Sequence, residues 1–166
     1  MAVSIHWVRV VLIVILIGSG FRAANTVDAA AKAAILRLHI PIAIGVLALT
    51  VLRIAWWWRF DRKPGPVAAS PHWQELTAKA VHVLFYLVIL GMIASGVGMI
   101  ALSGATPMIF SGESALLPDF WNYPHRLPHG IGARVLLVLL VLHAGAALYH
   151  HFVRRDSLLR RMRFSK

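Results

Sequence analysis

Four long apolar stretches dominate the pattern of hydrophobic and polar positions in this chain. They run over about residues 5–21, 33–58, 80–102 and 130–152, and shorter polar segments separate them. Each is long enough, or nearly so, to cross the ~30 Å hydrocarbon core of a bilayer as a helix. Backbone polar groups at that depth find no water, so helices are the expected form, and the alternating segments typical of a β-barrel are not seen. The pattern predicts an all-α membrane protein, a four-helix transmembrane bundle with one domain over residues 1–166.

The composition supports the membrane class and narrows the chemistry. Hydrophobic residues make up 59% of the chain, charged residues 14%, and the mean hydropathy is +0.73. The chain has no cysteine, which excludes disulfides, iron–sulfur clusters and covalent CxxCH haem attachment. The first apolar stretch lacks a basic segment before it and an A-x-A site followed by a soluble domain. We therefore expect it to be a retained helix rather than a signal peptide.

The net charge of +11 is distributed as a membrane topology signal. The segments after the second and fourth stretches carry Arg59, Arg62, Lys63, Arg154, Arg155, Arg160, Arg161, Arg163 and Lys166. The opposite loops carry Arg22, Lys32 and Arg126, balanced by Asp28, Glu113 and Asp119. By the positive-inside rule, both termini and the 59–79 loop are expected in the cytoplasm, with the basic tail touching anionic lipid. No nucleic-acid motif accompanies the charge, so nucleic acid is not expected as a partner.

The connection over residues 103–128 is the longest loop and is expected on the outer side of the membrane. It contains Phe120, Trp121 and Tyr123, aromatic residues that suit the membrane interface. A loop of this length is often functional, for example as a cap over a site.

Two histidines in the fourth apolar stretch have the most informative spacing in the chain. His129 and His143 lie fourteen residues apart. At 100° and ~1.5 Å per residue, that interval returns to within about 40° of the same face and rises ~21 Å. Ionisable side chains inside a membrane are costly and are functional candidates by default, although a single one can simply hydrogen-bond a neighbouring helix. Two on one face at this spacing favour the ligation of two stacked haems.

Depth in the membrane pairs these histidines with two others. His39 enters the second helix from the outer side, so its depth matches that of His129. His6 lies near the cytoplasmic end of the first helix and matches His143. Two imidazoles on one iron leave no open position, which favours electron transfer over oxygen binding. We therefore expect two non-covalent haem b groups with axial ligands from these four residues.

The inner site is less sharply defined by the residues alone. His150 lies seven residues beyond His143 and within about 20° of the same face, so depth alone permits either as the partner of His6. Arg53 lies fourteen residues after His39 and faces the same way at the inner depth. It has two interpretations: its guanidinium pairs with a haem propionate, or it extends to the cytoplasmic interface.

His82 lies close to the cytoplasmic start of the third helix. Together with His150 it is a candidate for hydrogen-bonding the carbonyl oxygens of a quinone, since histidine both donates to such an oxygen and transfers a proton. The alternative is that His82 caps or anchors its helix end. Gly91, Gly96 and Gly98 in the same helix have two interpretations: they allow a close approach to a neighbour or a flat ring, or they reflect how common glycine is in membrane helices.

Together these residues resemble the bacterial cytochrome b561 family, whose superfamily includes the cytochrome b subunits of nickel–iron hydrogenases. The matching segments, which extend over nearly the whole chain apart from the outer loop, are 4–7, 38–39, 81–86, 129, 142–144, 147–151 and 158–162.

The resemblance implies a four-helix di-haem cytochrome of the bacterial inner membrane with axial ligands at His6, His39, His129 and His143. It also implies a quinone site near His82. One activity of the family is superoxide oxidation on the outer face with reduction of ubiquinone, which requires cations such as Arg37 near the outer haem. The alternative function is a membrane anchor and electron conduit for a separate redox enzyme, such as a hydrogenase.

Overall fold

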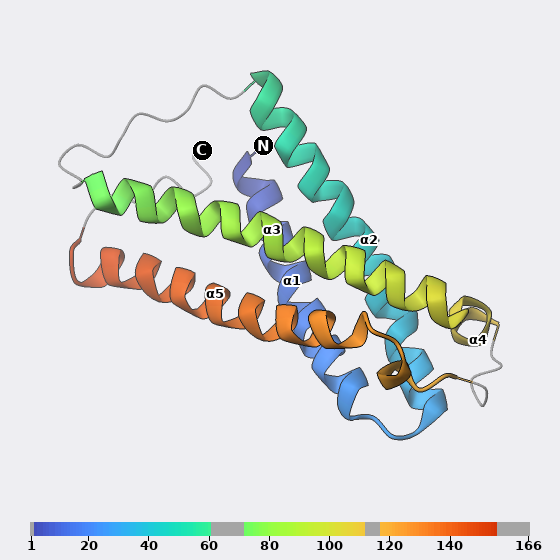
Figure 1. The fold of residues 1–166 in the computed structure, drawn as a ribbon. Helices are drawn as coiled ribbons and strands as arrows, with labels where there is room; N and C mark the ends of the chain where they lie inside the picture. The colour runs from blue at the N-terminus through green and yellow to red at the C-terminus, as the bar shows by residue number, and fades with distance from the viewer. Residues whose placement is uncertain (1, 61–71, 112–116, 156–166) are drawn as a thin grey trace.

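The computed structural model describes residues 2–60, 72–111 and 117–155, and its four long helices confirm the predicted class (Figure 1). The helices are α1 (Ala2–Asn25), α2 (Ala29–Phe60), α3 (His72–Ser103) and α5 (Arg126–Phe152), with a short helix α4 (Thr106–Phe110) and a 3₁₀ turn η2 (Phe120–Asn122) between α3 and α5. All four long helices are apolar enough to cross a membrane. The basic segments predicted within residues 61–71 and 156–166 lie outside the described residues.

The helices extend beyond the apolar stretches that predicted them, most of all at the start of α3. This helix begins at His72, whereas its apolar stretch begins near residue 80. The extra turns carry Glu75, which suits the positive end of the helix dipole. Thr77 bonds back to the carbonyl of Trp73 at 2.9 Å. Helical hydrogen bonds continue into the polar interface, so hydropathy alone underestimates the length of a helix.

The helices associate as two pairs. Helices α1 and α2 form the first pair and α3 and α5 the second, and the contacts between the pairs are much sparser than those within them. Figure 1 shows the two pairs crossing each other at an angle. The α1–α2 connection is short, and Asp28 caps α2 by accepting from the backbone N–H of Ala31 at 2.7 Å. A short connection of this kind makes consecutive helices antiparallel neighbours.

One buried side chain from each long helix forms the centre of the bundle. These residues are Ile13, Val46, Ile89 and Leu136. Most other large apolar side chains are exposed, including Val14, Leu87 and Leu142 at 51%, 63% and 65%. Such a surface is stable when lipid surrounds it, because lipid tails are as apolar as the side chains themselves.

The long loop after α3 is a packed cap at one end of the bundle. We call this end, which holds the α1–α2 turn, α4 and η2, the outer end, following the charge-based prediction (Figure 1). Ala105, Ile109 and Phe120 are buried there against apolar side chains of α2 and α3. The Arg37 side chain on α2 donates from Nε to the carbonyl of Ile109. Tertiary packing and this hydrogen bond therefore hold the described parts of this connection, residues 104–111 and 117–125, on the ends of the helices.

Candidate functional site

The imidazoles of His39 and His129 meet between the two helix pairs. His39 belongs to α2 and His129 to α5, and their ring centroids are 6.4 Å apart with an interplanar angle of 64°. Both side chains are half-buried. An imidazole nitrogen binds a transition metal at about 2 Å, so two imidazoles on opposite sides of one iron keep their centroids roughly 6 Å apart. The separation of these rings therefore fits a shared iron.

A serine on α1 fixes the orientation and tautomer of His39. Ser19 Oγ donates to the Leu16 carbonyl at 3.2 Å and lies 2.9 Å from His39 Nδ1. Because the hydroxyl proton is committed to the carbonyl, the serine oxygen accepts from Nδ1–H of His39. The lone pair of this imidazole is then on Nε2, the arrangement usual for a metal-binding histidine.

His129 has the same support from α3. Ser95 Oγ donates to the Met92 carbonyl at 2.9 Å and lies 3.1 Å from His129 Nδ1. His129 Nδ1 also lies 3.0 Å from that carbonyl oxygen. Since a carbonyl only accepts, Nδ1 of His129 carries the proton. In both imidazoles Nε2 thus carries the lone pair that a metal would use.

A glycine follows each serine and makes room for the histidine. A Cβ at Gly20 would lie 3.3 Å from His39 Cε1, and one at Gly96 would lie 3.2 Å from His129 Cε1. Reasoning from the sequence marked Gly96 as a close approach but missed Gly20 and both serines. The available signal was the Ser-Gly dipeptide, but it occurs four times in the chain, at residues 19–20, 95–96, 103–104 and 111–112, so it does not single out these two positions.

His125, which the sequence analysis also missed, lies one turn outward from His129. Its ring packs so closely on α3 that a Cβ at Gly98 would lie 2.5 Å from His125 Cδ2. Within the described part of the chain, its Nδ1 is buried and has no hydrogen-bond partner. A buried polar atom without a partner is costly, which makes it a candidate contact for a polar group of a ligand.

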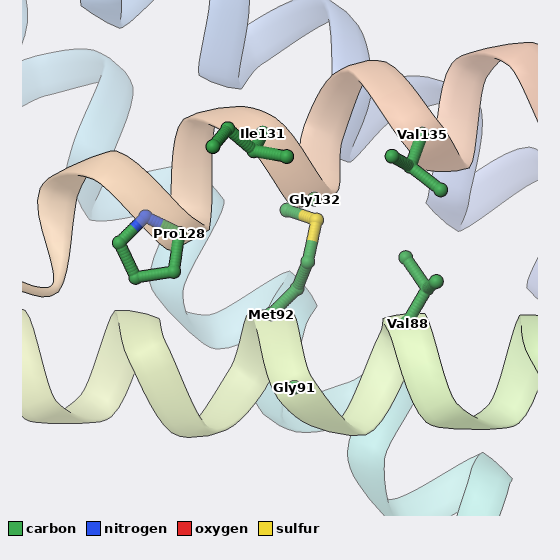
Figure 2. Close-up of a pocket in the computed structure, with 7 residues that line it drawn as sticks. All are labelled: Val88, Gly91, Met92, Pro128, Ile131, Gly132 and Val135. Carbon is green, nitrogen blue, oxygen red and sulfur yellow. The ribbon is translucent and has the colours of Figure 1, made fainter.

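The packing of α3 on α5 holds the outer histidine in register. Figure 2 shows the Met92 side chain lying against Gly132 of α5, where a Cβ would meet Met92 Cγ at 2.8 Å. The contact forms part of a groove of about 320 Å³ lined by Val88, Gly91, Met92, Pro128, Ile131, Gly132 and Val135. Because Met92 also supplies the carbonyl beside His129 Nδ1, the same close contact that joins the helices positions the imidazole.

At the opposite end of the bundle, His143 is surrounded by aromatic rings of α3. Its ring centroid lies 5.6 Å from that of His82 and 5.5 Å from that of Phe85. His82 Nδ1 lies 2.7 Å from the Ala78 carbonyl, so Nδ1–H donates and Nε2 is left with the lone pair. The side chains of Arg53, His143, Arg9 and His82 all lie within electrostatic range of His6. Residues assigned to the inner haem therefore gather at this end.

The nearby Arg9 is the charged residue most deeply buried in the described bundle. It is 9% exposed, and its guanidinium carbon lies 5.5 Å from the Tyr86 ring centroid. Across the described residues, Arg9 Nε is one of two buried side-chain nitrogens without a hydrogen-bond partner, the other being His125 Nδ1. One such atom therefore lies near the outer histidines and the other near the inner ones.

His150 packs against its neighbour Tyr149 with ring centroids 6.0 Å apart, and the His82 ring lies against that of His143.

Two arginines converge at the outer end of α5. Nη1 of Arg126 and Nη1 of Arg134 lie 2.9 and 3.5 Å from the place where a Gly130 Cβ would be. Arg134 Nη1 donates to the Gly130 carbonyl at 2.9 Å, and the Arg126 guanidinium lies 4.5 Å from the Trp121 ring. Arg37, expected as an outer cation, also donates a hydrogen bond to α4. Arg134 was not among the outer cations expected from the sequence.

Over residues 2–60, 72–111 and 117–155, no cluster of three or more His, Asp or Glu side chains gathers as a metal site. The histidines meet two by two, as His39 with His129 and as His82 with His143. A haem iron takes four equatorial bonds from its porphyrin and needs only two axial protein ligands. A membrane bundle with facing histidines between its helices is the architecture of a membrane cytochrome.

The chain belongs to the prokaryotic cytochrome b561 family, whose model matches residues 1–165. Family membership implies b-type haem, and together with the four spans it indicates a bacterial membrane protein. The chain is 29% identical to cytochrome b561 homolog 1 of Escherichia coli (strain K12), over 60% of this chain and 58% of that protein. It is 30% identical to cytochrome b562 of Cereibacter sphaeroides, over 75% of this chain and 65% of the relative.

A third relative matches over almost its full length. It is the probable superoxide oxidase CybB of Yersinia pestis, 26% identical over 96% of this chain and 92% of that protein. The chain covers less than two thirds of the first E. coli relative's own length. No solved structure matches the chain.

Proposed function

We propose that this protein is a di-haem b-type cytochrome that carries electrons from a donor at the outer end to ubiquinone at the cytoplasmic end. The observation that carries the proposal is the approach of His39 and His129 at 6.4 Å between centroids. Both Nδ1 atoms are hydrogen-bonded, so both Nε2 atoms are available to iron. Bound haem supplies one-electron redox chemistry, and two imidazole ligands favour electron transfer.

His39 and His129 are the proposed axial ligands of the outer haem. His125 Nδ1 lies one turn outward and is buried without a partner in the described chain. A haem propionate supplies the hydrogen-bond partner that this nitrogen lacks. Two observations therefore support the outer haem site: the facing imidazoles of His39 and His129, and the buried Nδ1 of His125, which has no hydrogen-bond partner in the described chain.

His6 and His143 are the proposed axial ligands of the inner haem. Arg53 and Arg9 are both electrostatic neighbours of His6. The buried Arg9 guanidinium requires an anion, and a propionate meets that requirement. Arg53 has the same role in this proposal, at the depth expected from its position fourteen residues after His39.

His82 and His150 are the proposed contacts for ubiquinone. His82 lies against His143, which shortens the path from the inner ligand to a quinone beside it. With Nδ1–H committed to the Ala78 carbonyl, His82 in its neutral form offers Nε2 to accept a hydrogen bond or proton. The His82 and His150 imidazoles can then take up and pass on the protons that quinone reduction consumes.

The proposed donor is superoxide, the substrate in the printed name of the Yersinia relative. Each superoxide loses one electron and leaves as dioxygen. Two such electrons and two protons convert one ubiquinone to ubiquinol. Arg126 and Arg134 converge beside Gly130, next to His129, and supply positive charge that attracts a small anion.

The proposal includes the orientation and the location of the protein. Both chain ends and the 59–79 loop face the cytoplasm, and the membrane is the bacterial inner membrane. The charge distribution supports this orientation.

The decisive experiment combines haem content with turnover. Purified protein should contain two haems b per chain, and superoxide should reduce added ubiquinone faster than spontaneous dismutation consumes it. One haem or none per chain would overturn the di-haem assignment. Two haems with quinone reduction only after a separate redox enzyme is added would instead favour the anchor and conduit function.

A further inference from the structure

We propose that Ser19 and Ser95 are positioning residues that set the redox potential of the outer haem, and that Ser19 has the larger effect. The inference rests on the proposed function, because it requires iron between His39 and His129. It adds to the proposed ligands two residues, Ser19 and Ser95, that hold the imidazoles in place.

The two serines occupy equivalent places in the two helix pairs. Ser19 lies on α1 beside the ligand of α2, and Ser95 lies on α3 beside the ligand of α5. Each hydroxyl donates to the carbonyl three residues earlier in its own helix. Each is followed by a glycine against which the imidazole rests. The same hydroxyl, carbonyl and glycine arrangement at both ligands indicates a shared role.

The physical effect of the serine passes through the imidazole. An acceptor at Nδ1–H withdraws the proton slightly and raises the basicity of Nε2. A more basic axial ligand stabilises ferric relative to ferrous iron and lowers the potential, one of the means by which proteins tune haem. Removing the acceptor should therefore raise the midpoint potential of the outer haem.

His39 and His129 differ in the hydrogen bond that remains at Nδ1 after the serine is replaced. His129 Nδ1 has a second acceptor, the Met92 carbonyl at 3.0 Å. Among the contacts of the described residues, Ser19 Oγ is the single acceptor for His39 Nδ1. Ser95→Ala leaves the proton of His129 bonded to Met92, whereas Ser19→Ala leaves that of His39 without an acceptor.

The test is a redox titration of purified Ser19→Ala and Ser95→Ala proteins, followed by haem absorbance and by electron paramagnetic resonance of the ferric state. Ser103→Ala is the matched control, because Ser103 makes the same bond three residues back in α3, to the Ile100 carbonyl at 3.3 Å, and makes no hydrogen bond to a histidine of the described chain. The outer haem is the titrating component that His39→Ala abolishes.

We expect Ser19→Ala to raise the potential of the outer haem and shift its ferric g-values, Ser95→Ala to do so less, and Ser103→Ala to leave both haems unchanged. If Ser19→Ala loses the outer haem, Ser19→Thr decides, since threonine keeps the hydroxyl. Retention of the outer haem at the wild-type potential in Ser19→Thr supports the inference, and loss of that haem overturns it.

Two further outcomes separate this inference from the proposed function. An outer haem whose potential is unchanged by both serine substitutions, or that shifts more in Ser95→Ala, overturns the inference alone. Wild-type protein without a haem that depends on His39 overturns the proposed function, and the inference with it.

Discussion

The imidazoles of His39 and His129 face one another from different helix pairs at a centroid separation of 6.4 Å. Each is oriented by a serine of its own pair. The two imidazoles thus meet only when the two helix pairs come together, while the orientation of each imidazole is set within its own pair.

Removing either outer histidine should remove one haem and spare the other. His39→Ala and His129→Ala should each lower the haem content from two per chain to one, because one imidazole cannot replace bis-imidazole ligation. A pyridine haemochrome assay measures the ratio. His72→Ala, at the exposed start of α3, is the control and should retain both haems. Two haems in either outer variant would contradict the assignment.

The inner ligand can be distinguished from the quinone contact by comparing two histidines of α5. His143→Ala should lose the inner haem, since His143 is a proposed axial ligand of that haem and its ring lies against His82. His150→Ala should keep both haems and slow only the reduction of ubiquinone. Haem content and steady-state quinone reduction provide the two measurements. If His150→Ala lost a haem and His143→Ala did not, the assignment of the two residues would be reversed.

The glycines beside the ligands should not tolerate a methyl group. Gly20→Ala places a Cβ 3.3 Å from His39 Cε1, so the imidazole must move; overpacking of this kind costs about 1–3 kcal/mol. We expect reduced occupancy of the outer haem and a lower thermal midpoint.

Gly18→Ala in the same helix is the matched control, because its Cβ would meet nothing within 4 Å. It should leave haem content unchanged and stabilise α1 by up to about 1 kcal/mol through helix propensity. Equal haem loss in Gly18→Ala and Gly20→Ala would show that the contact with His39 is unimportant.

The converging arginines at the outer end should accelerate the reaction with an anionic donor. Replacing both Arg126 and Arg134 with Gln should lower the second-order rate constant with superoxide by about tenfold at low ionic strength, and should flatten its salt dependence. Pulse radiolysis with haem absorbance measures the rate.

The single variant Arg126→Gln is compared with Arg22→Gln, which removes the same one charge at the end of α1 and should have a smaller effect. The redox potential should be unchanged in all of these arginine variants. A double variant with wild-type rate and salt dependence would contradict electrostatic attraction by Arg126 and Arg134.

Hydropathy and charge predicted the class, the number of spans and the long outer connection. Reasoning from depth also paired His39 with His129, which the structure brings together, although the ligand roles stay predictions. This success has a simple cause: in a membrane, the position of a residue along its helix fixes its depth, and depth limits its partners.

The residues that support the histidines could not be predicted from the sequence, because the rotation and close packing of the helices determine which side chains contact each imidazole. Ser19 and Ser95 are short polar residues in apolar helices, where bonding to their own backbone is the ordinary expectation. The ring contact between His82 and His143 was also not anticipated, because the rotation of α3 about its axis decides which ring of α5 it meets. Helix α4 was unexpected because its stability depends on Arg37 and on burial under residues distant in sequence.

The sparse contact between the two helix pairs has a consequence for how the protein matures. Each pair can fold as an inserted hairpin with its histidine already oriented, and in the proposed di-haem protein the porphyrins would then enter between two folded hairpins. Once seated, each iron would tie α5 to the first hairpin by a coordinate bond. Cofactor delivery and final assembly of the bundle would then be a single event.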